Sequence, residues 1–175
     1  MTIYSLALFV HIVGALMLFT AFTSEGISLF NLRRATTVAQ VREWEGVAGL
    51  ARIFGPASVV TILASGLYML FSTWGWVSWI AVGLVAWFLV AVAGALNGIR
   101  LSLVMRRIQP ESADLRGLRA RSFVMSWLAR LAVGLGIVFV MTDKPDLVWG
   151  IVCMGVAAAV GASAGAFVAH DAGPK

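Results

Sequence analysis

The chain has 175 residues, of which 61% are hydrophobic and only 12% are charged, and its formal net charge is +5. That apolar fraction is well above the level of soluble globular chains, so composition alone indicates a membrane protein. The single cysteine excludes a disulfide framework or a cysteine metal site within one chain. The excess positive charge is typical of loops beside a membrane and does not predict binding to nucleic acid.

Five apolar runs are long enough to cross a membrane, because a helical span needs about 20 residues to cover ~30 Å of hydrocarbon. They are residues 3–23, 56–73, 77–98, 123–141 and 147–169. We therefore expect an all-α, polytopic membrane helical bundle, with a single integral membrane domain over residues 1–175. Short connections after the second and fourth spans predict that spans two and three, and spans four and five, pack as antiparallel neighbours.

The stretch between the first two spans predicts one further helix. Residues 24–34 continue the first apolar run almost without a helix breaker, so the first helix is expected to project beyond the membrane. Residues 36–53 place apolar side chains near helical spacing with charged ones between them. This pattern predicts a cytoplasmic amphipathic helix on the membrane surface or against the bundle. Gly55 and Pro56 are expected to break the chain before the second span.

The distribution of arginine predicts the orientation. Ten arginines lie in the connections after the first and third spans, whereas the connections on the opposite side hold only Lys144. Arginine-rich loops remain cytoplasmic, so we expect a protein of the cell membrane with its N-terminus outside and its C-terminus in the cytoplasm. Tryptophans gather at the predicted outer interface, where an amphipathic ring is well placed. They are Trp74, Trp76, Trp79 and Trp149.

One charged residue lies deep inside a predicted span. Arg130 interrupts the fourth apolar run, and a charge that faces lipid there costs a few kcal/mol, so it should face a partner or a substrate path. Glu25 ends the first span, and Asn97 and Arg100 end the third. An ion pair of Glu25 with Arg130 or Arg100 would lock helices together. Alternatively, arginine would hold an anionic substrate, a lipid head group or a propionate.

A second candidate layer lies in the predicted outer half of the membrane. His11 is eight residues into the first span, Tyr68 is near the outer end of the second, and Met154 is seven residues into the fifth. A neutral imidazole at this depth could ligate haem iron, with Met154 or Met69 as a second axial ligand, or carry protons. The alternative is a histidine hydrogen-bonded to Tyr68 or to a backbone carbonyl. No HExxH or CxxC motif predicts a separate metal site.

Two GxxxG sequences predict close helix packing, because small residues let helix backbones approach. They are Gly94–Gly98 in the third span and Gly161–Gly165 in the fifth. Three settings remain open from sequence alone: contacts within one subunit, a homodimer interface, and contacts with partner membrane helices in the lipid bilayer.

Three segments resemble a known group of proteins. They are residues 8–19 (LFVHIVGALMLF), 55–70 (GPASVVTILASGLYML) and 141–147 (MTDKPDL). They look like small predicted integral membrane proteins of unknown function that are distantly similar to the copper-resistance D and HemJ-type protoporphyrinogen oxidase membrane domains. HemJ-type proteins are four-helix-like bundles whose first-helix histidine is implicated in haem binding, and His11 matches that position. The resemblance implies haem b as a cofactor held by His11.

The leading expectation is thus a small integral membrane protein that binds a hydrophobic or tetrapyrrole-like ligand, such as haem b, through an intramembrane histidine. Two alternatives stay open. One is a non-enzymatic structural or accessory subunit, whose polar residues only lock the bundle. The other is a lipid or small-molecule permease that uses Arg130. The sequence does not decide whether the chain is an enzyme.

Overall fold

The computed structural model describes residues 2–107, 118 and 120–171, and every regular element in them is helical. Arg116 and Arg119, two of the ten arginines in the predicted cytoplasmic loops, lie outside these residues. The long helices are α1 (Ile3–Arg34), α2 (Val38–Met69), α3 (Ser78–Arg107), α4 (Arg121–Asp143) and α5 (Leu147–Asp171). A short π-helical segment, η1 (Leu70–Trp74), continues α2. Each long helix is long and apolar enough to cross a membrane, which confirms the all-α helical bundle.

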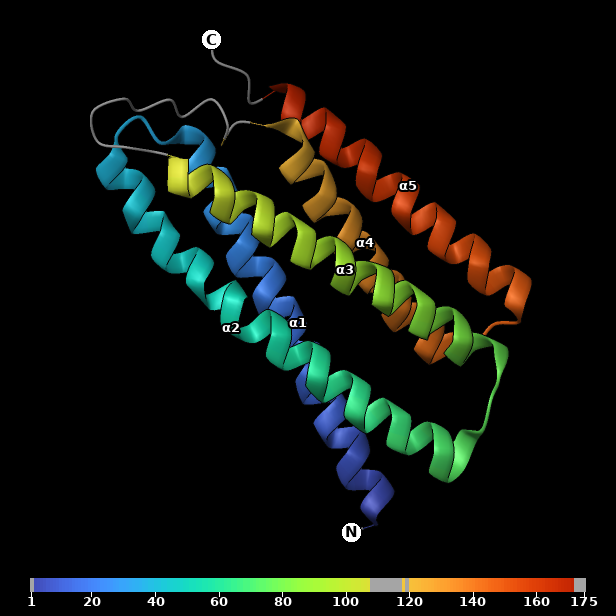
Figure 1. Cartoon of the computed structure of the whole chain (residues 1–175). Helices are drawn as coiled ribbons and strands as arrows, with labels where there is room; N and C mark the ends of the chain where they lie inside the picture. Colours follow the sequence, from blue (N-terminus) through green and yellow to red (C-terminus); the bar gives the residue numbers. More distant parts are fainter. Residues whose placement is uncertain (1, 108–117, 119, 172–175) are drawn as a thin grey trace.

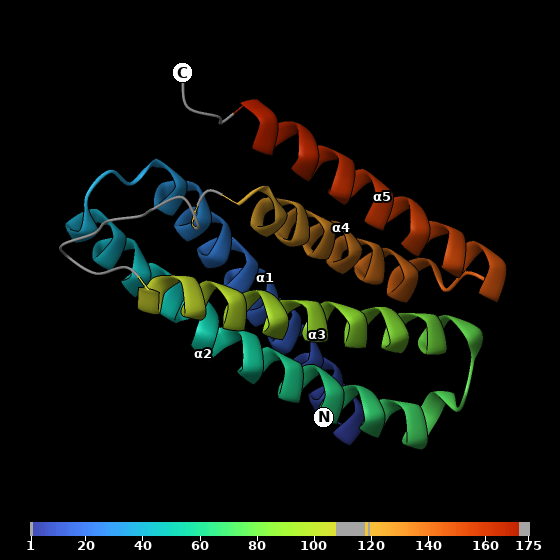
Figure 2. The same cartoon turned by 45° about the horizontal axis from the view of Figure 1, so that its top comes forward.

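The helices form two closely packed pairs with α3 between them. α1 packs against α2, α4 packs against α5, α3 contacts α4 and α5, and α1 contacts α4. Both views place α5 at one edge of the bundle and α2 towards the other (Figures 1 and 2). The predicted pairing of α4 with α5 is confirmed. The predicted pairing of α2 with α3 is wrong, because the two helices are joined at one end but share no packed interface.

The second helix differs from its prediction. The expected break at Gly55 and Pro56 is wrong, because α2 continues through Pro56 without interruption. The expected separate amphipathic helix is instead the first half of α2, and this part of the chain shows no surface helix of its own. A proline removes one backbone hydrogen bond inside a helix. Packing on α1 holds the helix together nevertheless: Val41 is buried, and Ser28 Oγ donates to the carbonyl of Trp44 at 3.0 Å.

The most continuous apolar core lies at the end of the bundle where α1 ends and α4 begins, which we call the arginine-rich end. Arg33 there donates from Nη2 to the carbonyl of Ala169 at 3.2 Å and so connects α1 to α5. Around it, side chains of four helices and of the segment before α4 pack into one cluster. The buried members are Leu29, Leu32, Ala35, Val41, Leu101, Leu118 and Phe123.

α1 and α4 meet along a seam that depends on one tryptophan. Trp127 Nε1 donates to the carbonyl of Phe22 at 2.8 Å, and the indole packs edge-on against Phe30 with ring centroids 5.6 Å apart. Gly26 faces the same indole so closely that a Cβ atom at this position would overlap the ring. The absence of a side chain at Gly26 therefore lets the indole reach the α1 backbone.

The opposite end, which we call the tryptophan end, is held together by aromatic contacts. Trp74 packs edge-on against Trp79 with centroids 5.4 Å apart, and its Nε1 donates to the hydroxyl of Tyr4 at 3.2 Å. Lys144 Nζ lies 4.3 Å from the centroid of the Trp74 ring, within cation–π range. These contacts connect α1, η1, α3 and the turn between α4 and α5, so the short connection from α2 to α3 is fixed in place.

The GxxxG sequence of α5 faces α4. A Cβ atom at Gly161 would lie 2.5 Å from the carbonyl oxygen of Leu128, and one at Gly165 would lie 2.6 Å from Cα of Met125. Both glycines therefore place the α5 backbone directly against that of α4. Of the three settings left open by the sequence, this one is a contact within the subunit.

Candidate functional site

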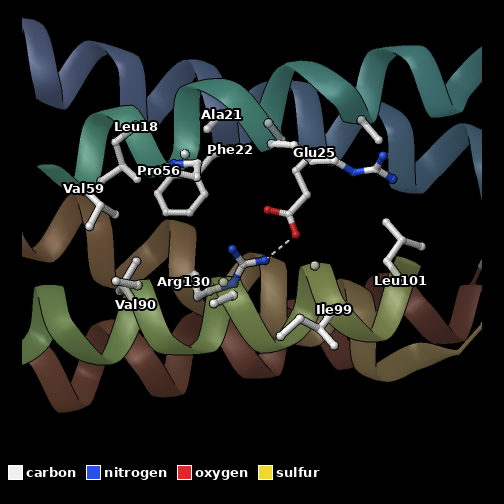
Figure 3. Close-up of a pocket in the computed structure, with 18 of the residues that line it drawn as sticks. Leu18, Ala21, Phe22, Glu25, Pro56, Val59, Val90, Ile99, Leu101 and Arg130 are labelled. Atoms are coloured by element: carbon white, nitrogen blue, oxygen red, sulfur yellow. Dashed lines mark hydrogen bonds and ion pairs between the residues drawn. The ribbon is translucent and has the colours of Figure 1, made fainter. Parts of the chain in front are cut away.

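A cavity of about 740 Å³ separates α2 from α3 and reaches inward to α1 and α4. Most of its walls are apolar side chains, and Figure 3 shows them on both sides of a central polar pair. Among them are Leu18, Phe22, Val59, Trp87, Val90 and Leu101. The cavity explains why α2 and α3 do not pack together although only three residues connect η1 to α3.

The central polar pair consists of Glu25 from α1 and Arg130 from α4, which point toward one another (Figure 3). Arg130 Nη2 lies 2.5 Å from Glu25 Oε1, and Asn97 Nδ2 of α3 donates to the same oxygen at 2.9 Å. The two charged side chains are only 7% and 17% exposed. One carboxylate oxygen thus joins three helices, and the ion pair predicted from the sequence is present.

Two contacts besides the ion pair accommodate the Arg130 guanidinium, whose Nε is buried without a hydrogen-bond partner among the described residues. Gly94 of α3 leaves room for it, since a Cβ atom there would lie 3.1 Å from Nη1. The Phe22 ring centroid lies 5.8 Å from Arg130 Cζ, which adds a cation–π contact. A buried charge is tolerated when a partner and further contacts offset its desolvation. The pair is electrically neutral as a unit.

Arginine also lines the cavity at the arginine-rich end, but at positions other than the one predicted. Arg100 is exposed and is not among the lining residues. Arg52 of α2 and Arg106 of α3 are lining residues instead. Arg52 Nη2 lies 3.7 Å from Glu45 Oε1, and both side chains are about half exposed, so the interaction is weak.

The position of these two arginines in the cavity wall could have been predicted from helical spacing. Lining residues recur every fourth position on one face of each helix, as expected for neighbours along a helix surface. On α3 they are Gly94, Gly98, Ser102 and Arg106, and on α2 they are Ala48, Arg52, Pro56 and Val60. The GxxxG sequence of α3 therefore belongs to the cavity wall.

His11 belongs to the contact between α1 and α2. Its Nδ1 is hydrogen-bonded to Ser65 Oγ at 3.1 Å, and a Cβ atom at Gly66 would lie 3.3 Å from its Cε1. The partner is thus Ser65 rather than Tyr68, whose side chain is 41% exposed. Met154 packs instead against Gly136 of α4, where a Cβ atom would lie 2.9 Å from its Cε.

The three residues of the predicted outer layer are not brought together. His11 lies against the backbone of α2, Met154 lies between α5 and α4, and neither lines the large cavity. Contacts on the Nδ1 and Cε1 side of the His11 ring hold α1 against α2. Haem b binding stays a prediction from sequence.

No protein-family model, no curated protein and no solved structure matches the chain. The likeness to HemJ-type membrane domains therefore remains a sequence-based expectation.

Proposed function

We propose that this chain is a small integral membrane protein of the cell membrane that binds a hydrophobic ligand between α2 and α3. The observation that supports this is the apolar cavity of about 740 Å³, which has the size of small-molecule sites, roughly 300–1,000 Å³. Because α2 and α3 share no packed interface, a ligand can enter between them from the lipid phase.

A purely structural role accounts for the polar pair but not for the cavity. Protein interiors are packed about as densely as organic crystals, and a void forfeits the dispersion energy of its lining atoms. If Glu25 and Arg130 only held the helices together, direct packing of α2 against α3 would make the bundle more stable. Small residues at Gly94 and Gly98 keep the space open instead. A bound ligand would fill that space and contact its lining atoms.

The proposed orientation has the N-terminus outside and the C-terminus in the cytoplasm. It is supported by ten arginines in the two connections of one side against one lysine opposite. The four interfacial tryptophans lie at the other end of the helices. In this orientation Glu25 and Arg130 lie in the cytoplasmic half of the bundle, and the arginine-rich end faces the cytoplasmic leaflet.

Quenching of Trp87 fluorescence tests the ligand site. Trp87 lines the cavity and is buried, so a brominated hydrocarbon chain reaches it only from inside the cavity. The Trp87 signal is the difference in quenching between the wild type and Trp87→Phe. Both proteins are measured with a brominated single-chain amphiphile in detergent micelles. Gly98→Leu fills the cavity, since Gly98 faces open space in its wall. We expect this variant to lower the Trp87 quenching at least about threefold.

Gly155→Leu is the matched control. Gly155 also has open space around it but lies on α5 away from the cavity, so both variants gain the same helix propensity. The control should quench like the wild type. Equal quenching in the two leucine variants, or no Trp87 quenching in the wild type, would reject binding in this cavity.

A further inference from the structure

The cavity carries an unbalanced positive charge at its arginine-rich end. A smaller cavity of about 320 Å³ there shares Arg52, Ser102 and Arg106 with the large one. Glu45 is the acidic residue among its lining side chains, and it faces Arg52 at 3.7 Å. In the described residues Arg106 has no ion-pair partner. Glu25 neutralises Arg130, so the described residues that line the two cavities carry one positive charge in excess.

The shape of the cavity suits an extended hydrocarbon chain. On α3 its lining runs from Trp87 to Arg106, about 28 Å at 1.5 Å per residue. A volume of about 740 Å³ spread over that length makes the cavity long and narrow, as an extended chain requires.

The two ends of the cavity differ in charge. Toward the tryptophan end the lining side chains are apolar, among them Trp87 and Val90. At the arginine-rich end they include Arg52 and Arg106. A long amphiphilic ligand therefore places its apolar tail toward the tryptophan end and its head group beside the two arginines.

We propose that the cavity binds one acyl chain of an anionic phospholipid, with the phosphate between Arg52 and Arg106. This inference rests on the proposed function and names its ligand class. The guanidinium fork matches phosphate oxygens in two parallel hydrogen bonds. Arg130 is not the head-group site, because Glu25 and Arg130 already neutralise each other. The acyl chain passes this neutral pair on its way to Trp87.

The test compares two brominated probes with the same chain, lysophosphatidylglycerol and a monoacylglycerol that lacks the phosphate, using the Trp87 quenching signal. The wild type should bind the anionic probe about tenfold more tightly, as expected for hydrogen bonds to a charged group. Arg106→Gln and Arg52→Gln should each reduce this preference to about threefold or less. High salt should weaken the preference as well, because the arginines at the mouth are accessible to ions.

Arg100→Gln is the matched control, since Arg100 is an exposed arginine of α3 outside the cavity wall. It should keep the full preference. Arg106→Lys retains the positive charge and should keep most of the preference for the anionic probe. This variant separates the effect of charge from an effect on folding. A third arm adds glycerol 3-phosphate, which has no hydrocarbon chain and should not compete at millimolar concentration.

The outcomes separate the two proposals. Equal affinity for both probes, with Gly98→Leu still blocking each, would overturn the head-group inference and leave the ligand cavity intact. No Trp87 quenching by either probe would overturn both. Competition by glycerol 3-phosphate as strong as by the lipid probe would overturn the lipid assignment, because a soluble phosphate would then be the ligand.

Discussion

At the scale of single residues, the stability of the bundle depends on Arg130, whose charge needs a partner when it is buried. Arg130 and Glu25 come from helices α4 and α1, and Asn97 adds a hydrogen bond from α3. Removing one member of a buried ion pair leaves the other charge uncompensated, which costs about 3–5 kcal/mol. The two members are not equivalent, because a carboxyl can take up a proton and become neutral, whereas a guanidinium stays charged.

We therefore expect Glu25→Leu to lower the melting temperature in detergent more than Arg130→Leu does. The first change strands a buried guanidinium, and the second leaves a carboxyl that still accepts from Asn97. The double variant should recover much of the loss, since replacing both partners by apolar side chains is often nearly neutral. Identical melting temperatures for the two single variants and the wild type would mean that the pair contributes nothing to stability.

Sequence could identify Arg130 because a charge inside an apolar run is conspicuous, and Glu25 and Asn97 followed from their depth in neighbouring spans. Arg52 and Arg106 were missed for the opposite reason. Arginines near the ends of spans are expected as interfacial anchors, so nothing in the chain marks these two as part of a cavity wall. His11 was placed at membrane depth, yet its partner Ser65 depends on how α1 and α2 rotate against each other.

At the scale of helices, glycine decides which faces touch. The α5 backbone reaches that of α4 at Gly161 and Gly165, so small residues there act as contact points. Gly155 of the same helix has nothing within 4 Å. Glycines less than three helical turns apart thus have different roles, and the sequence motif alone does not separate them.

This difference predicts opposite effects of one substitution. Gly161→Ala should lower the melting temperature, because overpacking against the α4 backbone costs about 1–3 kcal/mol and exceeds the gain in helix propensity of up to ~1 kcal/mol. Gly155→Ala should raise it slightly, because only the propensity gain applies. Thermal unfolding of both variants in one detergent measures the effects. A rise for Gly161→Ala would show that α5 does not pack on α4 through this face.

Helix existence was predictable, while helix boundaries and neighbours were not. Five apolar runs located all five long helices, since a membrane span must be apolar over its whole length. Pro56 is expected to break the helix, because a proline removes one hydrogen bond and causes a local clash. In the structure α2 continues through Pro56, and its packing against α1 stabilises it there. The separation of α2 from α3 has no local signal, because short connections usually join packed neighbours.

At the scale of the whole molecule, charge and aromatic residues divide the bundle into two unlike ends. Arginines surround the mouth of the cavity at one end, and tryptophans close the other. This division is the basis of the proposed orientation in the bilayer.

The orientation predicts which single cysteines an impermeant maleimide can reach in intact cells. In a Cys153→Ala background, Trp76→Cys should be labelled, because Trp76 is exposed at the tryptophan end. Thr36→Cys, in the exposed turn between α1 and α2, should be labelled only after the cells are permeabilised. The reverse pattern would place the arginine-rich end outside and would contradict the proposed orientation.

The contact between Gly26 and Trp127 has a consequence for how such chains can change over time. A side chain at position 26 would displace the indole, and loss of the indole would remove its hydrogen bond to the carbonyl of Phe22. The two positions are therefore expected to vary jointly in homologous chains, as are Glu25, the residue before Gly26, and Arg130, three residues after Trp127. Such paired substitutions, far apart in sequence, would reveal common descent where overall similarity has faded.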